Sequence, residues 1–133
     1  MWIARTLLAG FAIGLALIVL LPSEGHRVLG LVDTLAGLAS HAGIPYWVAF
    51  VAIEFAANIA LFVPFGVLLP LALGTTRTST LFATVAAGAA LSALIELAQL
   101  AIPGRVSTPA DVLANTIGTA VRVCLVVAIK LRR

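Results

Sequence analysis

Charged residues are scarce in this chain. They make up 10% of its 133 residues, against about 25% in typical soluble domains. Hydrophobic residues make up 62%, and the mean hydropathy is +1.20. A chain of this length cannot bury that much apolar surface in one core, because small domains bury a limited fraction of their area. The composition therefore excludes an ordinary soluble domain and indicates a membrane protein that is covered by lipid.

Cysteine and histidine are nearly absent as well. The single Cys124 excludes an intramolecular disulfide and a CxxC metal site. His26 and His41 lie far apart with no third ligand nearby, so no metal site is expected. The net charge is +3, but the basic residues are scattered singly except at the C-terminus, and no basic patch contains interleaved aromatic residues. We therefore expect no metal, no cofactor and no nucleic-acid partner.

Long apolar runs predict an all-α, polytopic membrane protein, because about 20 apolar residues suffice for one crossing. The predicted transmembrane helices are residues 2–21, 45–63, 80–102 and 109–129. Pro22 ends the first, and the hairpin PGRVSTP joins the last two. The second apolar run continues to Leu73, and Pro64 within it predicts a kink or break. We expect residues 1–133 to form a single transmembrane domain.

The first two spans are joined by a more polar segment, residues 22–44. Its ionisable residues are Glu24, His26, Arg27, Asp33 and His41. Apolar residues recur between them at helical spacing, which predicts a short amphipathic helix at the membrane surface. That helix is expected to serve either as a connector or as a lid over the bundle. In the first span, Gly10 and Gly14 form a GxxxG pattern that predicts a close contact with another helix of the bundle.

Basic residues predict the orientation. With both termini in the cytoplasm, the cytoplasmic side would hold Arg5, Arg77, Lys130, Arg132 and Arg133. The outer side would then hold only Arg27 and Arg105, as the positive-inside rule favours. We therefore predict that both termini are cytoplasmic and that the PGRVSTP hairpin lies outside.

Ionisable and amide side chains recur within the predicted spans, although an ionisable group costs about 2.5 to 3.5 kcal/mol at a helix centre. At 1.5 Å of rise per residue, Glu54, Glu96 and Asn115 lie at a similar depth, roughly 10 to 15 Å below the outer surface. Their neighbours follow the same helical faces. This pattern predicts an outward-facing polar cleft formed by Glu54, Asn58, Glu96, Gln99, Arg105, Asp111, Asn115 and Gly118.

Several uses of these side chains remain open. They could form a buried polar network in which Arg105 pairs with Glu96 or Asp111, or a site for a polar headgroup, a peptide or a proton. Two carboxylates could also act as general acid and base in a membrane enzyme on a lipid-linked substrate. No GxSxG, HExxH or P-loop supports catalysis, and Ser92 is one of few nucleophile candidates. A small transporter or proton path is a further alternative.

The polar residues also form an ordered motif. It reads Glu96-x2-Gln99-x5-Arg105-x5-Asp111-x3-Asn115-x2-Gly118, preceded by Asn58-x5-Pro64-x-Gly66. This motif, within about residues 54–122, resembles that of VanZ-like proteins, small bacterial membrane proteins named for a teicoplanin-resistance factor. The resemblance implies a polytopic helical protein of the bacterial cytoplasmic membrane. It also implies a non-catalytic cell-envelope factor that lowers sensitivity to lipoglycopeptides such as teicoplanin. The expected partners are the lipid bilayer and either a lipid-linked envelope precursor, a lipoglycopeptide or a partner membrane protein.

Overall fold

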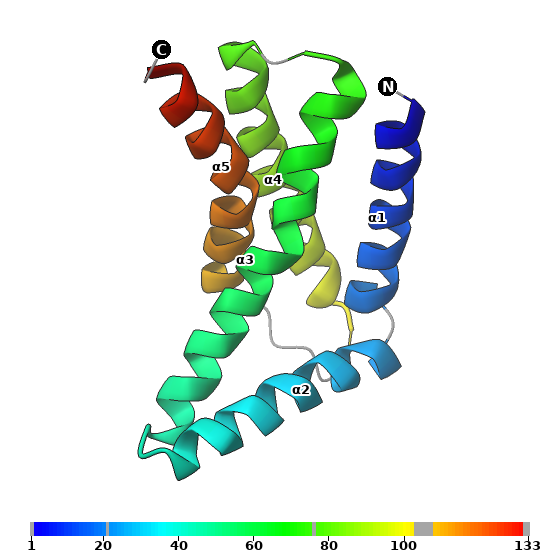
Figure 1. Cartoon of the computed structure of the whole chain (residues 1–133). Helices are drawn as coiled ribbons and strands as arrows, with labels where there is room; N and C mark the ends of the chain where they lie inside the picture. Colours follow the sequence, from blue (N-terminus) through cyan, green and yellow to red (C-terminus); the bar gives the residue numbers. More distant parts are fainter. Residues whose placement is uncertain (1, 21, 76, 103–107, 132–133) are drawn as a thin grey trace.

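A computed structural model of the chain describes residues 2–20, 22–75, 77–102 and 108–131, and every regular element within them is an α-helix. The helices are α1 (Trp2–Leu20), α2 (Pro22–His41), α3 (Tyr46–Leu73), α4 (Thr78–Gln99) and α5 (Pro109–Leu131). Helices α1, α3, α4 and α5 run lengthwise, whereas α2 lies across one end of the bundle (Figure 1). The predicted all-α class is confirmed for this part of the chain.

Helix α3 continues through both of its prolines. It passes Pro64 and Pro70 and ends at Leu73, so of the kink or break predicted at Pro64, the break is wrong. A proline removes a single backbone donor, and neighbouring helices can compensate for this loss in a packed bundle. Gly74, the residue after the helix, terminates it: its left-handed φ of 67° allows two backbone hydrogen bonds of 3.2 Å that close a Schellman motif.

Helices α3 and α4 are each long and apolar enough to cross a membrane, while the apolar part of α1, Trp2–Ile18, is shorter. Large apolar side chains remain exposed around the helices; Trp2 is 85% exposed, Phe82 65% and Leu94 63%. Polar side chains are buried instead, namely Thr84, Ser92, Glu96, Asn115 and Thr119. An apolar exterior around a partly polar interior is the arrangement expected of a protein that lipid surrounds.

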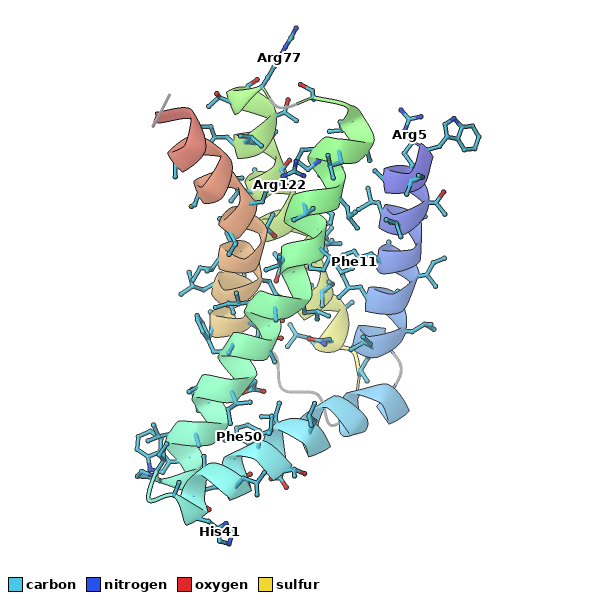
Figure 2. The ribbon with its side chains drawn as sticks, in the orientation of Figure 1. Arg5, Phe11, His41, Phe50, Arg77 and Arg122 are labelled. Carbon is cyan, nitrogen blue, oxygen red and sulfur yellow. The ribbon has the colours of Figure 1, made fainter. Side chains whose placement is uncertain are left out.

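Helix α1 packs on α3 through aromatic side chains. The ring of Phe11 lies between the two helices (Figure 2), and its centroid is 6.4 Å from that of Phe65. A Cβ built on Gly10 or Gly14 would have no atom within 4 Å. The predicted close contact through this GxxxG pattern is therefore wrong, because the aromatic face of α1 meets α3 and the glycine face does not.

Helix α2 has 20 residues and is longer than the short helix predicted. It packs on α3, and its buried positions include Val32 and Ala36. The hydroxyl of Tyr46, at the start of α3, donates a hydrogen bond to the Asp33 carboxylate. The apolar residues Leu31, Leu35 and Leu38 form an exposed stripe. Helix α2 therefore has an apolar face that the bundle does not cover.

The two ends of the bundle differ in charge. Both termini and the α3–α4 connection lie at one end, and α2 lies at the other (Figure 1). Arg5 and Arg77 lie at the end with the termini, whereas His41 lies at the α2 end (Figure 2). All five acidic residues belong to α2 or to the helix segments nearest it: Glu24, Asp33, Glu54, Glu96 and Asp111. Acidic charge is therefore concentrated at the α2 end.

Candidate functional site

Two polar side chains join α4 to α5 inside the bundle. The carboxamide Nδ2 of Asn115 donates a 2.8 Å hydrogen bond to Ser92 Oγ, and both residues are buried. The helices are antiparallel (Figure 1). Glu96 follows Ser92 by one turn and Asp111 precedes Asn115 by one turn, so both lie on the α2 side of this bond at a similar level. Glu96 and Asn115, which were predicted to share a depth with Glu54, thus lie about one helical turn apart: Ser92 is level with Asn115, and Asp111 is level with Glu96.

Both carboxylate oxygens of Asp111 are used. Oδ2 accepts hydrogen bonds from the Thr108 backbone N–H at 3.2 Å and from the Thr108 hydroxyl at 2.8 Å. The Asp111 N–H in turn donates to Thr108 Oγ1 at 3.3 Å, which completes a reciprocal capping box at the start of α5. Oδ1 accepts a 2.6 Å bond from Nδ2 of Asn58 on α3. The helix cap thus orients the carboxylate that binds α3.

Glu54 lies one turn from Asn58 on the same face of α3, toward α2. It is half-buried and close enough to Asp111 for the two negative charges to repel. Its carboxylate forms no hydrogen bond or ion pair with the described part of the chain. Glu54 and Asp111 are therefore two neighbouring carboxylates from different helices, and the donors to Asp111 carry no charge.

Asn115 is the most deeply buried amide of the site, at 4% exposure. Its Nδ2 has a partner in Ser92, but its Oδ1 has none among the described residues. An unsatisfied buried acceptor costs about 1 to 3 kcal/mol. The side-chain carbonyl oxygen of Asn115 is therefore an acceptor available to a donor from outside the described residues.

The other predicted site residues take different positions. Glu96 is buried on α4, at 9% exposure. Gln99 is half-buried, and its side chain forms no hydrogen bond with the described residues. Arg105 lies outside the described residues, so its pairing with Glu96 or Asp111 stays a prediction. Gly118 faces α3, where an added Cβ would overlap the backbone carbonyl of Ile59.

The chain matches a known protein family. The VanZ/LLP1 family profile matches residues 8–130. This chain belongs to the VanZ/LLP1 family. The match covers nearly the whole chain, from α1 to α5, and extends well beyond the motif region at 54–122. No curated protein and no solved structure matches the chain. Family membership and the apolar helices α3 and α4 together indicate a membrane protein.

Close packing of the VanZ/LLP1 helices depends on glycine. A Cβ on Gly66 of α3 would overlap the Thr119 backbone, and one on Gly88 of α4 would overlap the Thr119 side chain. Thr119 is fully buried, and its hydroxyl donates a 3.0 Å hydrogen bond to the backbone carbonyl of Asn115, one turn earlier in α5. Thr119 therefore fills the space between α3, α4 and α5 on the side of Asn115 that faces away from α2.

Thr108 and Thr119 were not among the predicted site residues of this VanZ/LLP1 chain. The pattern Thr108-x-x-Asp111 is readable as a capping box, since threonine and an acidic residue stand three apart before an apolar helix. No sequence signal distinguishes Thr119 from any other threonine in a span. Arg122, further along α5, lies far from Glu54: its Nη1 donates to the Val67 carbonyl, more than three turns from Glu54 along α3.

The hydroxyl groups of Ser92 and Thr108, beside the polar residues of this VanZ/LLP1 chain, are both engaged in hydrogen bonds. Ser92 Oγ accepts a hydrogen bond from the Asn115 side-chain amide. An amide is not basic enough to remove the proton of the Ser92 hydroxyl. The Thr108 hydroxyl contacts Asp111, but the same hydroxyl caps α5. Among the described residues, no group of three or more histidine, cysteine or acidic side chains is placed to hold a metal ion. The site thus offers hydrogen-bond acceptors and negative charge.

Proposed function

We propose that this VanZ/LLP1 protein crosses the bacterial cytoplasmic membrane four times, through α1, α3, α4 and α5, with both termini in the cytoplasm. Two features support this topology. The four helices run lengthwise in alternating directions, which brings both termini to one end (Figure 1). That end carries Arg5 and Arg77 (Figure 2), as the positive-inside rule favours for the cytoplasmic side. The exposed leucine stripe of α2 then lies in the outer membrane interface.

In this topology the protein is a non-catalytic cell-envelope factor. Its outward-facing polar cleft binds an envelope component and thereby lowers sensitivity to lipoglycopeptides such as teicoplanin. One observation carries this proposal: side chains of α3 and α4 both bind polar side chains of α5. Asn58 of α3 binds Asp111, and Ser92 of α4 binds Asn115. Asn115 Oδ1 remains available for a ligand. Polar groups inside a membrane bundle are costly, and a binding function accounts for their presence.

Expression in a sensitive Gram-positive host tests the function. The minimal inhibitory concentrations of teicoplanin, vancomycin and daptomycin are measured for the wild type, Asp111→Asn and Asn115→Ala. Thr34→Ala is the matched control, because Thr34 is exposed on α2 and its hydroxyl bonds only its own helix. The wild type and the control should raise the teicoplanin value, and the two site variants should not, at equal membrane abundance. An unchanged teicoplanin value with the wild type contradicts the resistance role.

A further inference from the structure

Two carboxylates in the outer half of the bundle, those of Glu54 and Asp111, have no cationic partner among the described residues. Asp111 is bound by an amide and by a threonine, both uncharged, and Glu54 has no hydrogen-bond or ion-pair partner among the described residues. The two charges are near enough to repel. In a half-buried position between apolar helices, such a pair favours a cation that binds both groups.

Asn115 supplies an independent indication of a ligand. It is 4% exposed and lies one turn from Asp111 on the same face of α5, and its Oδ1 has no partner among the described residues. Thr119 fills the space on the side away from α2, where Gly66 and Gly88 leave no room for another atom. Side chains of an α-helix lean toward its N-terminus, so the Asn115 side chain leans toward the turn that holds Asp111. Ionised carboxylates cannot donate a hydrogen bond to Asn115 Oδ1.

We infer that Glu54, Asp111 and Asn115 Oδ1 form a binding site for a primary ammonium group, carried either by a lipid headgroup or by a free amine. This inference rests on the proposed outward-facing cleft and names its ligand class. A primary ammonium has one positive charge and three N–H donors, which suits two carboxylates and one carbonyl oxygen. A quaternary ammonium has the charge but no donor, so Asn115 Oδ1 would stay unsatisfied.

Lipid selectivity of the purified full chain tests this site. The protein is placed in nanodiscs of phosphatidylcholine and phosphatidylglycerol with or without phosphatidylethanolamine, and the lipids that remain bound are counted by native mass spectrometry. In a second arm, ethanolamine or choline is titrated into nanodiscs that lack phosphatidylethanolamine, and the thermal midpoint is followed. The first arm reports a lipid headgroup and the second a free amine.

The wild type should retain phosphatidylethanolamine over phosphatidylcholine, or be stabilised by ethanolamine and not by choline. Glu54→Gln and Asp111→Asn should each weaken this binding about tenfold, as expected for loss of a charge-assisted hydrogen bond. Asp33→Asn is the matched control, since Asp33 is an exposed acidic residue of α2 whose carboxylate binds Tyr46 outside the proposed site, and it should leave the selectivity unchanged.

The wild-type measurement decides the question even if a variant fails to fold. No preference for a primary over a quaternary ammonium in either arm overturns the inference, as does an equal loss of binding in Asp33→Asn. The outcome is separate from the antibiotic test. If the chain selects primary amines but leaves teicoplanin sensitivity unchanged, the ammonium site is supported and the resistance role is contradicted. If it lowers teicoplanin sensitivity but does not select primary amines, the resistance role is supported and the ammonium site is contradicted.

Discussion

Asn58 on α3 donates a 2.6 Å hydrogen bond to Asp111 at the start of α5, although 53 positions separate the two residues in the chain. The same carboxylate closes the capping box with Thr108. One side chain therefore both starts a helix and fixes that helix against its neighbour. A purely local pattern, threonine followed three residues later by aspartate, in this way becomes part of the tertiary structure.

Loss of the Thr108 side chain should destabilise the protein through α5. Thr108→Ala removes the hydroxyl that accepts from the Asp111 N–H and donates to Asp111 Oδ2. We expect a loss of about 1 kcal/mol in the free energy of unfolding, the usual cost of removing a helix N-cap. Reversible unfolding in mixed detergent micelles measures it. Thr34→Ala, on the exposed side of α2, should change the stability far less, and equal losses in the two variants would argue against the cap.

The glycines of the bundle should differ sharply in their tolerance of a side chain. Gly118→Ala places a methyl group against the Ile59 backbone, so we expect a loss of about 1 to 3 kcal/mol from overpacking. Gly10→Ala has open space around the added carbon and should be neutral or slightly stabilising, because alanine favours a helix over glycine. The same unfolding assay compares the two. A harmless alanine at 118 would show that α3 and α5 are farther apart than described.

Breaking the buried hydrogen bond between Ser92 and Asn115 should cost more unfolding free energy than removing a hydroxyl that bonds only its own helix. Ser92→Ala leaves the Nδ2 of Asn115 without its acceptor, which should cost about 1 to 3 kcal/mol. Thr84→Val is the control: Thr84 is equally buried on α4, but its hydroxyl bonds only the Thr80 carbonyl of its own helix at 2.8 Å. It should cost less, because no other side chain loses a partner. A larger loss in Thr84→Val would mean that the α4–α5 bond contributes little.

Orientation can be measured with an impermeant maleimide on intact cells. In a chain whose Cys124 is replaced by alanine, His41→Cys should be labelled from outside and Arg77→Cys only after permeabilisation. The two positions are exposed and lie at opposite ends of the bundle (Figure 2). Labelling of Arg77→Cys in intact cells, without labelling of His41→Cys, would invert the topology proposed here.

Much of the helical framework follows from the sequence. Pro22 predicts the end of α1 and Pro109 the start of α5, because the length of an apolar run and the prolines that bound it are local signals. The end of α3 is not predictable in this way. Proline at position 64 has the same local chemistry in a continuous helix as in a broken one, and packing on neighbouring helices decides between them.

The candidate site is predictable in part. Spacing places Asp111 and Asn115 on one face of α5, because residues four apart share a helical face. It does not reveal that Asp111 binds Asn58 and that Asn115 binds Ser92, since such pairings depend on the crossing geometry of three helices. The failed GxxxG prediction at Gly10 has the same origin: small residues permit close approach, but they do not determine which face a neighbour meets.

The central claim is that polar groups from separate helices bind one another at a common site, and a double-mutant cycle on Asn58 and Asp111 tests it most directly. Unfolding free energies are measured for Asn58→Ala, Asp111→Ala and the double variant. Loss of the helix cap contributes equally with and without Asn58, so the cycle cancels it and isolates the interhelical bond. We predict a coupling energy of about 1 kcal/mol, with the double variant less destabilised than the sum of the two single variants. Strict additivity would contradict the account, because Asn58 and Asp111 would then not interact.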